Sequence, residues 1–171
     1  MVKNLSFIIL FTLISGFTVA QNKNREADLK AVFIYNFTRY IEWDSSDSSD
    51  NFIIAVIGSS PVTASLNEIA NSYAVNNKRI IVKVFGRPED IGNCQVLFIP
   101  QKLPWSLSSI LDRADKGVLT VSEQEGYASR GTTFNFVLVN NKLKFEANLK
   151  SIVAAGLKVS SQLLKLAIII Q

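Results

Sequence analysis

The sequence predicts a single α/β domain: a three-layer-type sandwich with a mostly parallel sheet, a C-terminal β-hairpin and long packing helices. Strand-like apolar runs alternate with helix-like stretches through the middle of the chain, which implies right-handed β-α-β crossovers between parallel strands. Near the C-terminus, two strand-like runs flank Asn140-Asn141, and asparagine tolerates the positive φ of a tight hairpin turn. The 171 residues contain no internal repeat and no linker long enough to separate two domains, and this length is typical of one domain.

The first half of the chain predicts two helices and two strands. Residues 25–43 predict a helix because most of their apolar side chains share one broad arc at helical spacing. Residues 52–57 are a continuous apolar run closed by Gly58, as in a strand buried on both faces. Pro61 opens a second helix to about residue 73, since proline is favoured at the first helical position. The alternation of residues 79–85 predicts the next strand.

The second half predicts a helix over residues 105–115 and further strands over residues 96–99, 118–122, 133–139 and 142–147. Pro100 and Gly117 supply breaks between these elements. Asn148 can cap a long final helix that runs from residue 149 to about residue 168. The polar side chains of that helix fall within one arc, so most of its surface is expected to be buried.

The N-terminal residues 1–20 predict a secretory signal peptide. Lys3 supplies a short cationic start, residues 5–17 form an almost wholly apolar run, and Thr18-Val19-Ala20 offers the small residues that a signal peptidase accepts. We therefore expect cleavage after Ala20, a mature domain over residues 21–171, a periplasmic location and no membrane insertion after cleavage. A retained membrane anchor is the alternative. The mild positive charge of the chain argues against nucleic-acid binding, which needs clustered Lys and Arg.

Composition excludes several classes of enzyme. The chain contains no histidine, which excludes Ser-His-Asp and Cys-His catalysis and every zinc site that uses histidine. Cys94 is the single cysteine, so an internal disulfide cannot form, while a disulfide between two copies is left open. We therefore predict no catalytic, cofactor-binding or metal-binding residues. An enzyme built on carboxylates such as Glu42, Glu123 and Glu146 remains a rival interpretation, and it needs two of them facing each other across a cleft.

The first helix contains the candidate partner-binding residues Tyr35, Arg39, Glu42 and Trp43. Aromatic side chains crowd this short stretch, and Tyr, Trp and Arg are favoured at protein interfaces. Two interpretations are open: a helix that presents part of an aromatic face to another protein, or a core helix whose Asn36 satisfies a buried backbone group. In either case the side that carries Tyr35 and Arg39 should be accessible, and Phe33, Phe37 and Tyr40 should be core.

An ordered set of segments resembles the YfiR-like family of secreted bacterial proteins. The first helix matches through Leu29-Lys30-Ala31, Tyr35-Asn36-Phe37 and Glu42-Trp43. The further matching segments are residues 55–58, 94–99, 117–122, 134–149 and 156–167. The stretch Asn140-Asn141-Lys142-Leu143-Lys144-Phe145-Glu146-Ala147-Asn148-Leu149 is especially similar to the family. The resemblance spans essentially the whole mature chain.

This resemblance implies an α/β sandwich without catalytic activity that acts as a periplasmic regulator. The best-understood behaviour of the family is repression of an inner-membrane diguanylate cyclase through its periplasmic sensor domain, which restrains cyclic-di-GMP signalling and biofilm formation. We therefore expect the partner to be the periplasmic domain of an inner-membrane signalling protein, either a diguanylate cyclase or a sensor kinase. A homodimer is left open. Two departures matter: a lone Cys94 cannot reproduce an internal disulfide switch, and Asp44 follows Glu42-Trp43 where family members often have proline. A small-ligand receptor, with a pocket beyond the strand ends near Gly58 and Pro100, is the alternative function.

Overall fold

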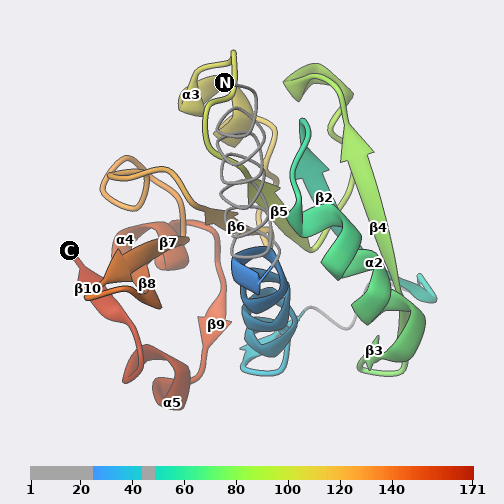
Figure 1. Ribbon diagram of the computed structural model, residues 1–171, viewed down its shortest axis with the longest axis horizontal. Helices are drawn as coiled ribbons and strands as arrows, with labels where there is room; N and C mark the ends of the chain where they lie inside the picture. The colour runs from blue at the N-terminus through green and yellow to red at the C-terminus, as the bar shows by residue number, and fades with distance from the viewer. Residues whose placement is uncertain (1–24, 44–48) are drawn as a thin grey trace, which may run out of the picture.

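A curled mixed sheet forms the centre of the protein (Figure 1). The computed structural model describes residues 25–43 and 49–171, and in this part of the chain the sheet has eight strands in the order β10-β8-β7-β6-β5-β2-β4-β3. The strands are β2 (Asn51–Ile57), β3 (Ala74–Val75), β4 (Lys78–Phe85), β5 (Val96–Ile99), β6 (Leu119–Ser122), β7 (Phe134–Val139), β8 (Lys142–Asn148) and β10 (Ile168–Ile170). Neighbouring strands are parallel except β3 with β4 and β7 with β8. The predicted α/β class is confirmed.

Short helices cover both faces of this sheet. They are α1 (residues 25–38), α2 (Val62–Ser72), α3 (Leu107–Leu111), α4 (Leu149–Ala154) and α5 (Ser161–Leu164), with a 3₁₀ turn at Pro88–Asp90. In β2, Phe52 and Ile54 pack into a core shared with α1 and α2, whereas Ala55 and Ile57 face a second core that contains α3. Both faces of β2 are buried, which explains its uninterrupted apolar run.

The central strands and the hairpin agree with the sequence prediction. β5 occupies the predicted residues 96–99, and β2, β4 and β6 begin within one residue of the expected positions. Asn140 and Asn141 have φ values of 50° and 58°, so they form the tight turn between β7 and β8. Helix α3 is shorter than the predicted 105–115, because it starts only after Ser106 and ends at Leu111.

The first helix ends earlier than the predicted residue 43. Its helical backbone stops at residue 38, and Ile41–Glu42 form strand β1, which pairs antiparallel with β9 (Lys158–Val159). The Ser160 backbone N–H donates to the Tyr40 carbonyl oxygen at 2.8 Å. The Trp43 indole N–H donates to the Thr38 carbonyl oxygen at 3.0 Å, which satisfies an acceptor at the helix end. Long-range pairing with β9 therefore replaces the last helical turn.

The predicted long helix over residues 149–168 is wrong, and with it the expectation of long packing helices. Asn148 does cap a helix, since its side-chain oxygen accepts the Ser151 N–H at 2.9 Å. That helix, α4, ends near Gly156, whose φ of +71° lies outside the helical region. The chain then forms β9, α5 and β10, and Ser160 caps α5. A helix-like apolar spacing continues through this segment, but short elements form instead.

The predicted signal peptide at residues 1–20 and Asp44 lie outside the described residues. Within the described ranges, none of the helices is both long enough and apolar enough to cross a bilayer.

Candidate functional site

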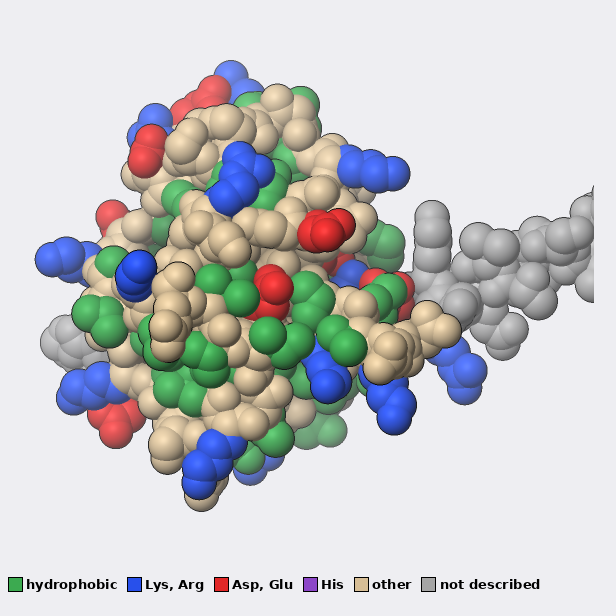
Figure 2. All heavy atoms as spheres, turned by 90° about the vertical axis from the view of Figure 1, so that its left-hand side faces the viewer, with side chains coloured by type: hydrophobic (Ala, Val, Ile, Leu, Met, Phe, Trp, Pro, Cys, Tyr) green, Lys and Arg blue, Asp and Glu red, His purple; other side chains and the backbone are tan. Residues whose placement is uncertain are grey.

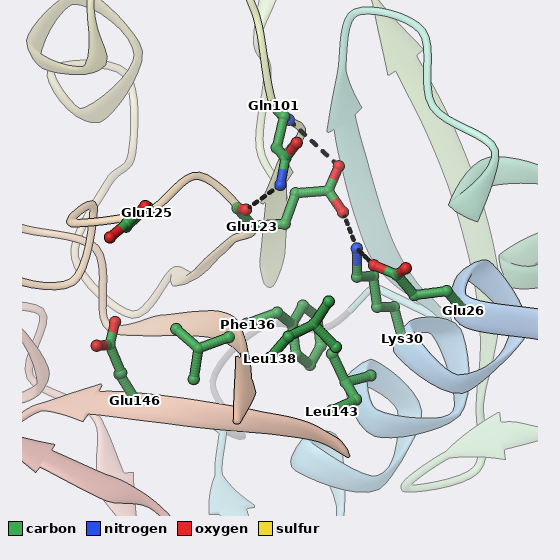
Figure 3. Close-up of a pocket in the computed structure, with 10 residues that line it drawn as sticks. Glu26, Lys30, Gln101, Glu123, Glu125, Phe136, Leu138, Leu143 and Glu146 are labelled. Atoms are coloured by element: carbon green, nitrogen blue, oxygen red, sulfur yellow. Dashed lines mark hydrogen bonds and ion pairs between the residues drawn. The ribbon is translucent and has the colours of Figure 1, made fainter. Parts of the chain in front are cut away.

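A cavity of about 450 Å³ opens beyond the carboxyl ends of β5 and β6. Its wall is built from α1, from the loops that follow these two strands, and from the β7–β8 hairpin (Figure 3). A smaller cavity of about 230 Å³ adjoins it and extends toward Ser60 and Pro61, at the start of α2. Both cavities include Lys30 and Glu123. The sequence placed a candidate ligand pocket beyond the strand ends near Gly58 and Pro100. Neither residue lines these two cavities, but both cavities are lined by Gln101, which follows Pro100.

A buried lysine lies between two glutamates at the centre of this region (Figure 3). Lys30 is only 7% exposed, and its Nζ lies 2.5 Å from Glu123 Oε2 and 2.6 Å from Glu26 Oε1. Burial alone lowers the pKa of Lys30, but the hydrogen bonds and negative charges of Glu123 and Glu26 outweigh it, so the pKa is raised above its ordinary value. Lys30 therefore stays charged at neutral pH and is not available as a nucleophile.

Glu123 is held by the loop after the neighbouring strand. The backbone N–H of Gln101 donates to Glu123 Oε1 at 3.2 Å, and the Gln101 side-chain amide donates to the Glu123 carbonyl oxygen at 2.7 Å. Gln101 follows β5 and Glu123 follows β6, so these contacts connect the ends of two parallel strands. Together with Lys30 they fix the position of the Glu123 carboxylate, which is 12% exposed.

Glu146 reaches the cavity from β8 and is held by a buried polar chain. Ser122 Oγ donates to Asn135 Oδ1 at 2.7 Å, and the Asn135 amide donates to Glu146 Oε2 at 3.0 Å. Ser122 and Asn135 are fully buried between β6 and β7. These hydrogen bonds satisfy the buried polar side chains of Ser122 and Asn135, which would otherwise destabilise the core. They also orient Glu146 toward the cavity wall.

The cavity combines an excess of negative charge with an apolar floor. Glu125 and Glu146 lie apart from the Lys30 ion pairs, so Lys30 does not neutralise them (Figure 3). Phe136, Leu138 and Leu143 supply the apolar surface. The described residues include no group of three or more Cys, Asp or Glu side chains arranged to hold a metal ion. Such a surface is suited to an organic molecule with a positive charge and an apolar portion.

The carboxylates singled out in the sequence are divided between two places. Glu123 and Glu146 both line the cavity. Glu42 lies in β1 and is exposed, with its Oε2 3.4 Å from Lys158 Nζ. Lys30 was missed on the sequence because its partner Glu123 is 93 residues away in the chain. The buried neighbours Ala27, Ala31 and Ile34 do show that the buried face of α1 passes through Lys30.

The four predicted partner-binding residues do not form one surface of equal exposure. Arg39 and Glu42 are exposed. Tyr35 is half-buried, and its ring centroid lies 5.0 Å from that of Tyr73 at the end of α2. Trp43 is also half-buried and packs edge-on against Phe52 at 5.1 Å. Trp43 thus stabilises the core as well as the end of α1.

The apolar arc predicted for the first helix is rotated in the structure. Phe37 is core as expected, and its ring lies 4.8 Å from both Phe134 and Phe145. Phe33 is half-buried, and the prediction that Tyr40 is core is wrong, since Tyr40 is 40% exposed. Leu29 and Val32 of the same arc are 51% and 47% exposed. Tyr73, which follows α2 and lines a groove together with Val32, is 55% exposed. We call Leu29, Val32, Tyr40 and Tyr73 the α1–α2 face.

The order of segments that first suggested a family is supported by comparison with known proteins. A family model described as YfiR/HmsC-like matches residues 27–168. The chain belongs to the YfiR/HmsC-like family. Proteins of this family are periplasmic regulators of signalling rather than enzymes. A comparison with curated proteins found no match.

Cys94 is the only cysteine of this YfiR/HmsC-like chain, and it is a free, buried thiol. Burial, reinforced by the negative charge of Asp115 and partly offset by Lys83, raises the pKa of Cys94 to about 12. Thiol–disulfide exchange requires the thiolate, which is scarce at neutral pH for such a group. Both the burial and the raised pKa oppose the disulfide between two copies that the sequence left open.

Proposed function

We propose that this YfiR/HmsC-like protein is a non-enzymatic periplasmic regulator that binds the outer domain of an inner-membrane signalling protein and modulates its output. The partner is a diguanylate cyclase or a sensor kinase, and with a cyclase the output is cyclic-di-GMP and biofilm formation. Family membership supports the regulatory role. The observation that carries the docking proposal is the α1–α2 face, a set of exposed apolar side chains on α1 and just after the C-terminal ends of α1 and α2.

The α1–α2 face has the composition of a protein interface. Two aliphatic side chains, Leu29 and Val32, and two tyrosines, Tyr40 and Tyr73, leave about half of their surface exposed. A groove of about 240 Å³ runs between the helices and is lined by Val32, Ile69 and Tyr73 with Asp28 and Glu68. The exposed Arg39 lies at the end of α1 beside this surface. An apolar centre with a charged rim is typical of docking sites.

The same proposal includes export and processing of the chain. Residues 1–20 act as the signal peptide, and residues 21–171 form one mature domain in the periplasm. The order of a cationic start, an apolar run and small residues supports this. The intact mass of the exported protein should correspond to a chain that begins at Gln21, and a mature form that retains Met1 would contradict it.

Capture of the partner from membranes tests the docking proposal. The mature protein, immobilised, should retain from solubilised inner membranes a protein with a periplasmic domain and a cytoplasmic cyclase or kinase domain. Val32→Ala and Arg39→Ala should each weaken binding of the isolated outer domain by roughly 30-fold, which corresponds to about 2 kcal/mol. Val153→Ala is the matched control, because Val153 is 78% exposed on α4, outside this face.

Two results would contradict this proposal. One is a set of captured proteins without any membrane signalling protein. The other is unchanged affinity of folded Val32→Ala and Arg39→Ala variants, with unfolding midpoints equal to that of the wild type. In the second case the partner binds another surface, and the assignment of Tyr35, Arg39, Glu42 and Trp43 to docking fails with it.

A small-ligand receptor is the second candidate function, and the cavity around Lys30 favours it. We propose an organic cation with an apolar portion as the ligand class, because Glu125 and Glu146 are not neutralised by Lys30 and the floor is apolar. Helix α1 contributes Lys30 to the cavity and the neighbouring Leu29 to the α1–α2 face. A ligand in the cavity would therefore contact the same helix that docks on the partner.

A pair of matched probes tests the ligand proposal. Phenethylamine should raise the unfolding temperature of the protein, and phenylacetate, of similar shape and opposite charge, should not. Glu125→Gln together with Glu146→Gln should abolish the effect of the amine. Equal shifts with both probes, or a shift that survives the double substitution, would exclude recognition of a cation by this cavity.

A further inference from the structure

The net charge of the chain is concentrated in its C-terminal segment. Of the 18 basic and 14 acidic residues, residues 142–171 contain five basic ones, all of them lysine, and a single acidic one, Glu146. The other 13 basic and 13 acidic residues balance each other in residues 1–141, so the formal charge of +4 arises entirely from residues 142–171. A charge asymmetry of this kind indicates a negatively charged partner.

Exposed aliphatic side chains lie among these lysines. Val153 on α4 and Leu166 just before β10 are 78% and 71% exposed, and Ile168 and Ile169 of β10 are 37% and 41% exposed. Residues 142–171 form one side of the molecule, drawn in orange to red in Figure 1. Figure 2 views the protein from that side, and hydrophobic side chains gather across its middle, with basic groups around them and a few acidic groups.

The strand register places the lysines next to these aliphatic side chains. Lys165 directly precedes Leu166 in the chain. The end of β10 pairs with the end of β8, where α4 begins. Lys150 and Val153 are three residues apart on α4, so they lie on the same side of that helix. We call these residues the C-terminal face: Lys150, Val153, Lys165, Leu166, Ile168 and Ile169.

The positive charge of this face is not neutralised by the described residues. Both of its lysines are exposed, and neither forms an ion pair within residues 25–43 and 49–171. The same holds for the exposed Lys142 and Lys144 on β8. Glu146 is half-buried and lines the cavity, where it accepts a hydrogen bond from the Asn135 amide. The C-terminal face therefore combines aliphatic surface with uncompensated positive charge.

We propose that the C-terminal face binds the surface of an anionic lipid bilayer. Its aliphatic side chains would lie at the boundary between headgroups and acyl chains, and its lysines at the level of the phosphates. This is a peripheral contact at the headgroups, and no segment crosses the bilayer. Protein interfaces are enriched in Tyr, Trp and Arg and depleted in Lys, and residues 142–171 contain no Tyr, Trp or Arg. The composition therefore favours a lipid surface over a second protein.

The lipid contact goes beyond the proposed docking and leaves the docking surface free. The C-terminal face lies at one side of the molecule, and α2, which packs on β4, lies at the other (Figure 1). The α1–α2 face therefore stays accessible while the C-terminal face lies on a bilayer. The outer domain of a protein in the same membrane can then contact the α1–α2 face without displacing the lipid contact.

Flotation with lipid vesicles tests this proposal. The mature protein should float with vesicles of phosphatidylcholine and phosphatidylglycerol but not with vesicles of phosphatidylcholine alone. Because salt screens exposed charges, the bound fraction should fall when salt rises from about 0.05 M to about 0.5 M. Equal flotation with both kinds of vesicle, or no flotation with either, would overturn the proposal.

Paired charge substitutions test which side of the protein meets the lipid. Lys150→Gln together with Lys165→Gln should weaken binding to the anionic vesicles about 30-fold, because each lysine near such a surface contributes about 1 kcal/mol. Arg79→Gln together with Lys83→Gln is the matched control: both residues are exposed on β4, and the loss of net charge is the same. The control should bind as the wild type does, and equal losses in the two variants would overturn the proposal.

A polarity-sensitive fluorophore reports whether the face contacts lipid. In a Cys94→Ala background with an unchanged circular dichroism spectrum, a nitrobenzoxadiazole group on Leu166→Cys should show blue-shifted emission with anionic vesicles. The same group on Val84→Cys, at a 54% exposed position on β4, should not. No shift at Leu166→Cys, or equal shifts at both positions, would contradict the proposal.

Binding of the C-terminal face to an acidic protein is the alternative outcome. If the Lys150→Gln, Lys165→Gln variant floats as the wild type does but loses affinity for the isolated outer domain of the membrane partner, the face belongs to that protein and the lipid proposal is wrong. Loss of docking in the α1–α2 variants Val32→Ala and Arg39→Ala should leave flotation unchanged, so the two proposals can fail separately.

Discussion

Residues 51–122, which run from β2 to β6, and residues 149–171 differ in how far local sequence determines their structure. Both segments are rich in apolar residues. In the first, β2 and β5 are buried on both faces, and glycine or proline follows directly where they end. In the second, Val153, Leu166, Ile168 and Ile169 remain exposed, and four short elements replace the predicted helix. Apolar spacing shows where such side chains recur, and it does not show what covers them.

The physical reason is the range of the contacts that decide each segment. The position of a strand such as β5 can be read from its own four residues. All four are buried, so all four are apolar and form an uninterrupted run. Strand β9 exists because it pairs with β1, more than a hundred residues earlier, and β10 exists because it pairs with β8. No sequence pattern within residues 149–171 indicates that β9 pairs with β1 or that β10 pairs with β8. The local signal that was present, Gly156 at a position with positive φ, marks the end of a helix.

Truncation of one large side chain in each segment should give the largest contrast. Phe98 in β5 is fully buried in the core, whereas Leu166 is 71% exposed. Phe98→Ala should lower the free energy of unfolding by about 3–5 kcal/mol, because it removes buried area and leaves a cavity. Leu166→Ala should change it by less than about 0.5 kcal/mol. Denaturant unfolding of both variants and the wild type at one protein concentration measures both values; similar losses would contradict the contrast.

The stability of the core beside β5 should depend on alkaline pH through Cys94. The pKa of this thiol is raised to about 12 in the folded protein, against about 8.5 in an unfolded chain. Between these values the folded state binds more protons, so stability falls as pH rises. From pH 7.5 to pH 10 the wild type should lose about 2 kcal/mol more than Cys94→Ala.

Comparison with Cys94→Ala cancels the other groups that titrate in this range, so the difference reports on the thiol. Equal losses in the two proteins would show that Cys94 is hydrated in solution, and that the core next to β5 is less tightly packed than the structure has it.

Substitution of Gly156 should change the free energy of unfolding only modestly, and it tests what ends α4. Its φ of +71° is unfavourable for other residues, and an added Cβ would meet no atom within 4 Å. Gly156→Ala should therefore cost about 1 kcal/mol through backbone conformation alone. Gly86→Ala is the matched control, since Gly86 is equally uncrowded and lies outside the positive-φ region, and it should be neutral or slightly stabilising. No loss at Gly156 would mean that the segment relaxes toward the predicted helix.

The candidate site could be predicted only in part, for the same reason. Parallel strand ends indicated a pocket near Gly58 and Pro100, and the cavity instead lies beside Gln101, with Glu123 and Glu146, which were visible as carboxylates in the sequence. Their meeting at one cavity depends on the strand order, which brings β6, β7 and β8 side by side. Lys30 was missed because its role is created by Glu123 on another element. On α1, helical spacing identified Phe37 as core, but the small residues Ala27 and Ala31 turn the buried face away from Tyr40.

Site-specific photo-cross-linking in intact cells tests the docking claim most directly. A photoreactive amino acid at Val32, on the α1–α2 face, should form an adduct with an inner-membrane protein that carries a periplasmic domain and a cytoplasmic signalling domain. The same group at Val153, which is more exposed, should not. Adducts of the signalling protein at Val153 but not at Val32, or at neither position, would contradict the assignment of the α1–α2 face as the docking surface.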